Sequence, residues 1–291
     1  MNYNFFIIGG DKRNLLLAKR LSKNGENVKI FGFNRIKDSF FANNNIKKIA
    51  NEKILISELK NIEKKENKKI IIGPIPYSID GKTLYAPFND KNININLLKN
   101  EKIIAGKIPS EIADKESIDI LKDECFTIKN TVPTAEGAIA KAIELTDINI
   151  FRANVMVLGF GRVGKTLCYK LKSLGANVYA EARKEKDLAW IDVLGYKAIP
   201  LEKINENLCK MNIIFNTIPK LILDKSKLIL INESTVIIDL ASKPGGIDYE
   251  SANKMGINTI LYTGIPGKIA GEYEAELIEE IIYKKITNIT N

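Results

Sequence analysis

The alternation of apolar and polar segments repeats once along the chain. Residues 5–31 begin with an apolar run, pass through a glycine turn and an amphipathic segment, and end in a second apolar run. Residues 155–181 have the same layout, and the spacing L-x-x-x-G-x-x-V occurs in both copies, from Leu21 and from Leu171. This order is typical of a strand–helix–strand unit with parallel strands. We therefore predict two α/β domains of similar design.

Further apolar runs extend both predicted sheets. In the first domain they lie at residues 68–76 and 101–106, and the polar segment 77–92 is expected to be a long loop at the carboxyl edge of the sheet. In the second domain, the predicted strands are Asn154–Leu158, Asn177–Glu181, Tyr196–Pro200, Ile213–Asn216, Val236–Leu240 and Thr259–Tyr262.

The segments that join these sheets suggest the domain boundaries. Residues 130–146 contain Pro133, then Thr134 as an expected N-cap, then apolar residues at helical spacing, which predicts a linking helix. We assign a flavodoxin-like or Rossmann-like substrate and partner domain to residues 1–130, a doubly wound Rossmann domain to residues 131–270, and a C-terminal helix returning to the first domain to residues 271–291.

Composition limits the function classes. The formal net charge of this 291-residue chain is +9, but its lysines are scattered among Glu and Asp, which indicates a solvated surface rather than a nucleic-acid-binding stripe. No apolar run is long enough to span a bilayer and no signal-peptide pattern is present, so we expect a cytoplasmic protein without a membrane partner. Histidine is absent, which excludes an imidazole base or a His-ligated metal, and we expect no metal. We expect Cys125, Cys168 and Cys209 to be reduced packing residues.

The stretch GFGRVGKT, residues 159–166, fits two phosphate-binding patterns. Gly159, Gly161 and Gly164 match the G-x-G-x-x-G turn of dinucleotide-binding proteins, whereas the same stretch matches the G-x-x-x-x-G-K-T loop of P-loop proteins. The second pattern has support from Asp239, which ends an apolar run as a magnesium-binding Asp would. A P-loop nucleotide hydrolase therefore stays open as an alternative.

Sequence context favours the dinucleotide turn. Gly161 would let the backbone approach a pyrophosphate and Gly164 would let helix and strand pack closely, and a P-loop requires neither. Arg183 follows the second strand, where the adenosine ribose is bound. Lys165 and Thr166 would then be ordinary helix residues. The expected cofactor-binding residues are Gly159, Gly161, Arg162, Val163, Gly164, Arg183, Asn216, Thr217 and Pro219.

The choice between NADP and NAD depends on the end of the strand 177–181. Arg183 would accommodate a 2′-phosphate, whereas an acidic residue would bond a free 2′-hydroxyl. Glu181 is one position early for that acid, and strand alternation is expected to turn its side chain away. In the alternative interpretation, Glu181 is a surface residue at the sheet edge. We expect NADP, with NAD as the alternative.

Several stretches resemble the A subunit of dipicolinate synthase. They are spread over nearly the whole chain: GGDKR, PTAEGAIAKAIE, NVMVLGFGRVGKTL, FNTIP, IDLASKPGGID and GIPGKIA. The resemblance implies an NADP-dependent oxidoreductase of spore-forming bacteria that acts on a CH–CH bond. It would oxidise a dihydro- or hydroxytetrahydro-dipicolinate, from a branch of the lysine pathway, to dipicolinate in the mother cell. It also implies a partner, the flavoprotein-like B subunit of dipicolinate synthase, and we expect an oligomer.

This reaction suits a chain without histidine, because its aromatic product provides a large driving force and a modest base suffices. Glu136 is the candidate proton acceptor, with a helix N-terminal charge as its alternative role, and Lys243 is a second catalytic candidate. The dicarboxylate substrate requires cations or N–H groups in an interdomain cleft. Its candidate ligands are Arg13, Thr134, Ser242, Lys243 and Lys268.

Four of the substrate candidates also have a simpler interpretation. Arg13 would otherwise be a surface helix residue, Thr134 a cap, and Ser242 with Lys243 a simple turn. Gly245 and Gly246 would let the backbone come close to a ligand.

The segment after Gly267 departs from the family pattern PG-x-x-A-P-K-T-A-G, and Lys268 is expected to replace part of the lost cation. Phe151 stands where the family has His. A non-catalytic or divergent NADP-binding subunit is therefore the main alternative function.

Overall fold

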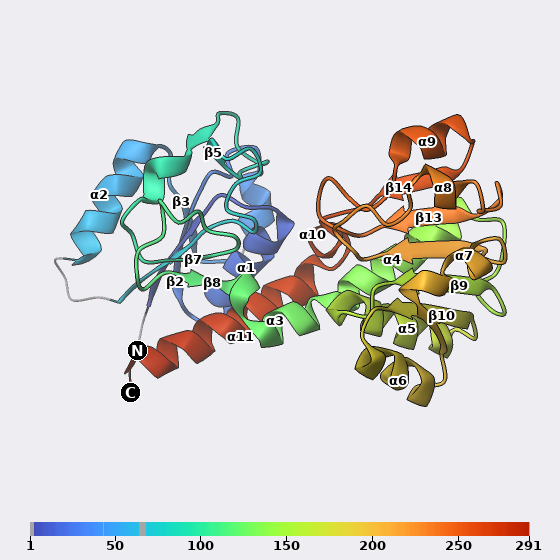
Figure 1. Ribbon diagram of the computed structural model, residues 1–291. Helices are drawn as coiled ribbons and strands as arrows, with labels where there is room; N and C mark the ends of the chain where they lie inside the picture. Colours follow the sequence, from blue (N-terminus) through green and yellow to red (C-terminus); the bar gives the residue numbers. More distant parts are fainter. Residues whose placement is uncertain (1–2, 43, 64–67, 291) are drawn as a thin grey trace. The chain divides into compact units, whose positions relative to one another are not determined.

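The computed structural model describes residues 3–42, 44–63 and 68–290. The chain divides into two compact units (Figure 1). Unit 1 comprises Met1–Lys129 and Ala270–Asn291, and unit 2 comprises Asn130–Ile269. Within the described ranges, no helix has both the length and the apolar character needed to cross a membrane.

Unit 1 contains a six-stranded parallel sheet with the strand order β3-β2-β1-β4-β7-β8. A small antiparallel pair, β5 with β6, lies outside it. The strands are β1 (Asn4–Ile8), β2 (Asn27–Phe31), β3 (Ile46–Lys48), β4 (Lys69–Ile72), β5 (Thr83–Leu84), β6 (Ile93–Asn94), β7 (Ile103–Ala105) and β8 (Ile118–Asp119). The α-helices are α1 (Lys12–Lys23), α2 (Glu52–Glu63), α3 (Glu124–Lys129) and α11 (Gly271–Thr290). Short 3₁₀ turns lie at Asp38–Phe41, Ile95–Leu98 and Ile120–Lys122.

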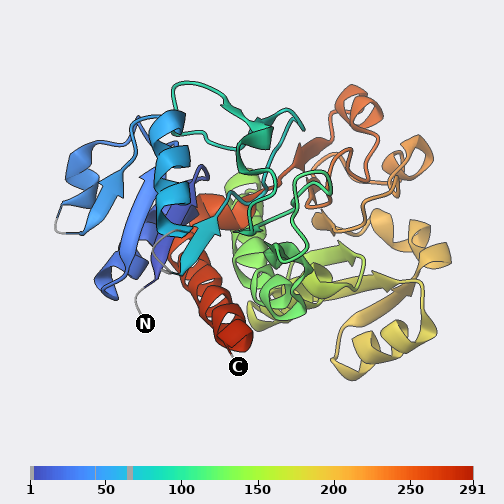
Figure 2. The same ribbon diagram turned by 90° about the vertical axis from the view of Figure 1, so that its left-hand side faces the viewer.

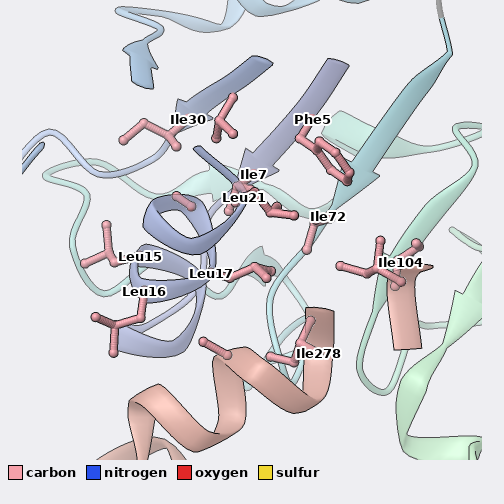
Figure 3. Close-up of a cluster of buried hydrophobic side chains, with 14 of the residues drawn as sticks. Phe5, Ile7, Leu15, Leu16, Leu17, Leu21, Ile30, Ile72, Ile104 and Ile278 are labelled. Carbon is pink, nitrogen blue, oxygen red and sulfur yellow. The ribbon is translucent and has the colours of Figure 1, made fainter. Parts of the chain in front are cut away.

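Alternate residues of β1 bury opposite faces of this sheet, as the two-residue period of a strand requires. Phe5 and Ile7 join a core with α1 and α11, and Figure 3 shows Leu17 of α1 and Ile278 of α11 in this cluster. Phe6 and Ile8 join a second core that includes Leu55 and Leu59 of α2. Helices therefore cover both faces, and the C-terminal helix packs on α1 within unit 1 (Figure 2, α11 in red).

Unit 2 repeats this design with the strand order β11-β10-β9-β12-β13-β14, again with every pair parallel. The strands are β9 (Asn154–Leu158), β10 (Asn177–Ala182), β11 (Lys197–Pro200), β12 (Ile213–Asn216), β13 (Val236–Asp239) and β14 (Asn258–Leu261). The α-helices are α4 (Thr131–Leu145), α5 (Arg162–Ser173), α6 (Glu185–Val193), α7 (Asn205–Leu208), α8 (Lys225–Leu228), α9 (Tyr249–Lys254) and α10 (Ile265–Ile269), with a 3₁₀ turn at Leu201–Lys203. Val155 and Val157 pack in a core with α4 and α5, and Met156 and Leu158 pack in a core with α7, α8 and α9.

Both sheets therefore have the 3-2-1-4-5-6 strand order of a Rossmann sheet, and the predicted fold class is confirmed. The six strands predicted for the second domain agree with β9–β14 to within one residue at each end. One local prediction was wrong. Helix α4 begins at Thr131 rather than after Thr134, because Pro133 fits the first turn of a helix. The predicted loop 77–92 is irregular except for the two residues of β5.

Candidate functional site

The glycine turn of unit 2 lies at the carboxyl end of β9. Gly159 has a φ of +93°, and Gly161 is the N-cap of α5. A Cβ atom built on Gly164 would lie 2.0 Å from the carbonyl oxygen of Gly159, so only glycine permits this close contact between helix and turn. A Cβ atom on Gly161 would meet nothing within 4 Å. The turn therefore presents open space at the N-terminus of a 12-residue helix, an arrangement that suits an anion.

The two residues that would mark a P-loop have other contacts. Helix α5 already begins at Arg162, so Lys165 lies inside the helix rather than where a loop meets it. The Thr166 hydroxyl lies 2.6 Å from that of Thr131 and donates to the Arg162 carbonyl at 3.2 Å. The Lys165 Nζ lies 5.5 Å from the ring centroid of Phe160. This geometry favours the dinucleotide turn over the P-loop.

Asp239, the candidate magnesium ligand of the P-loop alternative, is fully buried and bound by its own chain. Its Oδ1 accepts hydrogen bonds from Asn216 Nδ2 (2.9 Å) and the Ala241 amide (2.9 Å). Its Oδ2 accepts from the Gly246 amide (2.7 Å) and the Tyr249 hydroxyl (2.6 Å). Four donors satisfy this carboxylate, which holds the loop after β13 in place.

Glu181 lies differently from its prediction. Its side chain is 1% exposed, and Oε2 accepts a hydrogen bond of 3.0 Å from the Gly159 amide. It is therefore neither turned away from the turn nor on the surface, because β10 pairs directly with β9 and brings residue 181 beside the end of β9. Among the described residues, Oε1 is buried and has no hydrogen-bond partner. Burial raises the pKa of the Glu181 carboxyl, while the Gly159 amide and the charge of Arg183 oppose that shift.

Arg183 follows β10 directly and is exposed. Its guanidinium makes no hydrogen bond or ion pair with any residue that the structure describes, although its charge acts on Glu181. A cation with free donors thus lies one strand away from the glycine turn, where a Rossmann sheet binds the adenosine ribose.

The turn 216–219 after β12 is held by internal hydrogen bonds. The Asn216 side chain is buried, donates to the Ile218 carbonyl and to Asp239, and accepts from the Ile218 amide. The Thr217 hydroxyl donates to the Leu158 carbonyl at 2.9 Å. Asn216 and Thr217 therefore shape the edge of the sheet beside Gly159, while Pro219 is exposed.

The loop after β13 contains two of the predicted substrate ligands. Ser242 and Lys243 are exposed, and within the described ranges their side chains make no hydrogen bond or ion pair. Gly245 and Gly246 are buried. A Cβ atom on Gly246 would lie 2.4 Å from Asn216 Nδ2, so this glycine is needed for packing of the loop against its own chain.

The remaining candidates of unit 2 have partners. The Thr134 hydroxyl donates to the Asn130 carbonyl inside α4 (2.9 Å). Glu136 is exposed and accepts a hydrogen bond from Lys170 at 2.7 Å. Lys268 is exposed, and its Nζ donates to the Thr263 carbonyl at 2.8 Å.

Arg13 of unit 1 is 8% exposed, so its alternative as a surface residue is wrong. Its guanidinium binds both carboxylate oxygens of Asp11, with NH2 2.8 Å from Oδ2, and also donates to the Ile75 carbonyl. Its NH1 lies 3.7 Å from Glu274, which is fully buried. Burial raises the pKa of Glu274 to about 7. Arg13 is thus the centre of a buried ion cluster.

The cysteines were expected to be packing residues, which holds for one of them. Cys168 is buried in the core beneath α5, whereas Cys125 and Cys209 are exposed. All three thiols are free.

Comparisons with known proteins agree with the motifs. Residues 4–117 match the family model described as the N-terminal domain of the dipicolinate synthase A subunit. The chain is 28% identical over 297 residues to the dipicolinate synthase A subunit of Bacillus subtilis (strain 168), covering 97% of this chain and 95% of the relative. The crystal structure of the dipicolinate synthase A chain from Bacillus subtilis superposes with a TM-score of 0.85 at 27% identity, covering 100% of this chain and 97% of that chain. The corresponding A subunit from Bacillus halodurans superposes with a TM-score of 0.78 at 29% identity, covering 98% of each chain.

Two Rossmann-type sheets, one with an open glycine turn, define a two-domain α/β protein with a site suited to a nucleotide phosphate. Within that class, the chain is similar to the dipicolinate synthase A subunit over 97% of its length, and the resemblance found in its motifs is confirmed.

Proposed function

We propose that this chain is a dipicolinate synthase A subunit that oxidises a dihydro- or hydroxytetrahydro-dipicolinate to dipicolinate with NADP. The observation that carries the proposal is the glycine turn at 159–164, which faces open space in a relative of this enzyme subunit. The proposal includes synthesis in the mother cell of a sporulating bacterium, a branch of the lysine pathway as the source of substrate, an oligomeric state, and a partner, the flavoprotein-like B subunit.

The residues of unit 2 fit a nicotinamide dinucleotide. The amides at the start of α5 and the open side of Gly161 would bind the pyrophosphate, and the free guanidinium of Arg183 would bind a 2′-phosphate. When bound, NADP accepts the hydride. The buried carboxyl of Glu181 holds the Gly159 amide and so fixes the start of the turn.

A dihydro-dipicolinate ring loses one hydrogen as a hydride and one as a proton as it becomes aromatic. A hydroxytetrahydro-dipicolinate must also lose its hydroxyl group and a ring hydrogen as water. Ser242 and Lys243 are the ligands proposed for the substrate carboxylates, because their polar atoms are exposed and make no bond within the described part of the chain. Glu136 is proposed as the proton acceptor, a role that requires its pair with Lys170 to open. Thr134 and Lys268 would have to exchange their present hydrogen bonds to bind the substrate.

The first experiment is a titration of the purified chain with NADPH and with NADH. It is followed by ultraviolet detection of dipicolinate after NADP⁺ and freshly made tetrahydrodipicolinate precursor are added. We expect tighter binding of NADPH and formation of product. Gly161→Asp places a carboxylate where the pyrophosphate would lie and is expected to weaken NADPH binding by roughly 100-fold or more.

Asn253→Asp is the control, because it adds a carboxylate at an exposed position of α9, outside the turn. Unchanged NADPH binding by Gly161→Asp would refute the assignment of the turn. NADPH binding without dipicolinate formation, even when the B subunit is present, would favour the non-catalytic subunit instead. Magnesium-dependent ATP binding that Lys165→Ala abolishes would favour the P-loop hydrolase.

A further inference from the structure

Unit 1 contains a cavity of about 550 Å³ that the proposed reaction does not use. Its volume lies within the range of small-molecule sites, about 300–1,000 Å³. It is formed by the end of β2, the end of β3, the start of α2 and part of the loop before β6. The residues around it are Ile30–Asn34, Asp38, Lys48–Glu52, Asn89 and Lys91–Ile93.

The cavity has a specific position in the sheet. In a Rossmann sheet, the turn after the first strand binds phosphate, and the end of the second strand binds the adenosine ribose. Strands β1 and β2 hold these positions in unit 1, as β9 and β10 do in unit 2. The cavity therefore lies at the adenosine position of unit 1, equivalent to the surroundings of Arg183 in unit 2.

The phosphate position of unit 1 is closed by its own chain. When the two turns are aligned at their first glycine, Asp11 takes the place of Gly161, and its carboxylate is bound to Arg13. The Gly10 amide donates to the Tyr85 carbonyl at 2.7 Å. A carboxylate and a covered amide leave no site for a pyrophosphate, so a dinucleotide does not fit here.

The residues around the cavity balance in charge. Lys48 and Lys91 offset Asp38 and Glu52, and Lys48 is already paired with Asp38 at 2.7 Å. Four asparagines lie around the cavity: Asn34, Asn51, Asn89 and Asn92. The chain itself uses part of three of them, because Asn34 Oδ1 and Asn51 Oδ1 accept from the Asp90 and Ile54 amides and Asn89 Nδ2 donates to the Lys91 carbonyl. The remaining carboxamide donors and acceptors are the groups left for a ligand. Apolar walls come from Phe31, Ile49 and Ile93, each at most 7% exposed. These groups suit an uncharged ligand with a flat apolar face and several polar edges.

We propose that this cavity binds a purine nucleoside of the adenosine class, without its phosphates. The base lies against the apolar walls, and the carboxamides bond the ribose hydroxyls and the polar edges of the base. The site is separate from the proposed NADP site, because every residue around it belongs to unit 1.

The test is a calorimetric titration of the full-length Gly161→Asp variant with adenosine. This variant disables the proposed NADP turn, so binding that remains reports on unit 1. We expect one adenosine per chain. Ala50→Trp fills the edge of the cavity and is expected to weaken adenosine binding by roughly tenfold or more, whereas Ala113→Trp, exposed in the same unit but away from the cavity, leaves it unchanged.

Asn92→Ala provides a second variant that removes polar groups without adding bulk, and a loss of roughly three- to tenfold in affinity is expected. The proposal is overturned if adenosine shows no saturable binding, if Gly161→Asp abolishes it, or if Ala50→Trp binds as well as Ala113→Trp. Tighter binding of adenosine monophosphate than of adenosine would also overturn it, because the phosphate position is closed. NADPH binding by Ala50→Trp, measured on the chain with Gly161 intact, reports separately on the proposed function.

Discussion

The two glycine turns differ, although each follows the first strand of a sheet with the same strand order. In unit 2, Gly161 faces open space and Gly164 packs against the turn. In unit 1, Asp11 and Asn14 hold the equivalent positions, and Asp11 binds the guanidinium of Arg13. A shared sheet therefore does not imply a shared phosphate site, because the ion cluster of Asp11, Arg13 and Glu274 and the bond of the Gly10 amide to the Tyr85 carbonyl close the turn of unit 1.

The largest expected effect concerns the closed turn. Arg13→Met would remove the cation beside the partly buried Asp11 and the buried Glu274, and we expect the free energy of unfolding to fall by about 3–5 kcal/mol. Arg35→Met is the matched control, because its ion pair with Asp90 is exposed and contributes at most about 1 kcal/mol. Urea unfolding measures both. If Arg13 instead serves as a substrate ligand, Arg13→Met will raise the KM and leave stability unchanged.

The second prediction concerns the pH dependence of this cluster. The pKa of Glu274 is raised from 4.5 to about 7, so the folded chain binds more protons than the unfolded chain between these values. The contribution of Glu274 to stability is therefore present below pH 4.5 and is lost as the pH rises through 7. Glu274→Gln removes this dependence, and we expect its stability relative to the wild type to rise by at most about 3 kcal/mol across the window.

Thermal or urea unfolding from pH 4.5 to pH 8 measures the difference between the two proteins. Glu276→Gln, an exposed acid on the same helix, is the control and should follow the wild type at every pH. Parallel stability curves for Glu274→Gln and the wild type would show that the cluster does not titrate in this range.

The sequence predicted both sheets but not the difference between their turns. Apolar runs, the glycine turns and the repeated L-x-x-x-G-x-x-V spacing depend on neighbours in the chain, so they indicated the two strand–helix–strand units. The burial of Arg13 depends on its contacts with Ile75 and Glu274. Both residues are distant in sequence, so no pattern of neighbouring residues predicts these contacts. An alignment of the two copies would have exposed one signal, because Asp11 stands where the open turn has Gly161.

The orientation of Glu181 was missed for a related reason. Strand alternation considers one strand alone, whereas the residue that Glu181 faces is set by the pairing of β10 with β9. Only that register places the carboxyl against the amide of Gly159. Arg183, two residues further along, lies beyond the end of β10 and stays exposed.

A third prediction separates stability from binding within the open turn. Gly164→Ala places a methyl group 2.0 Å from the Gly159 carbonyl oxygen, and we expect a loss of about 1–3 kcal/mol in the free energy of unfolding. This clash outweighs the gain of up to about 1 kcal/mol in helix propensity. Gly161→Ala adds the same methyl group in open space, and because Gly161 is the N-cap of α5, where Gly is favoured over Ala, we expect a smaller loss of at most about 1 kcal/mol. Equal stabilities of the two variants, measured by urea unfolding, would mean that the helix does not need to approach the turn so closely.

The smallest expected effect concerns how each turn holds its first amide. In unit 1, the Gly9 amide donates to the backbone carbonyl of Phe31, 22 residues later. In unit 2, the Gly159 amide donates to the side chain of Glu181, which is also 22 residues later. The acceptor in unit 2 is therefore a side chain, which a substitution can remove. Glu181→Ala leaves this amide without its acceptor, and we expect NADPH affinity to fall by roughly three- to tenfold.

Glu181→Gln keeps an acceptor oxygen of similar reach and should therefore restore NADPH affinity to within about twofold of the wild type. The ratio of NADPH to NADH affinity distinguishes a positioning role from direct contact with the ribose. If Glu181 only holds the turn, Glu181→Ala weakens both nucleotides equally and the ratio is unchanged. If its charge faces the 2′-phosphate, Glu181→Gln binds NADPH more tightly while its NADH affinity stays the same. Equal NADPH affinities for the wild type and Glu181→Ala would mean that the open turn keeps its shape without a side-chain acceptor.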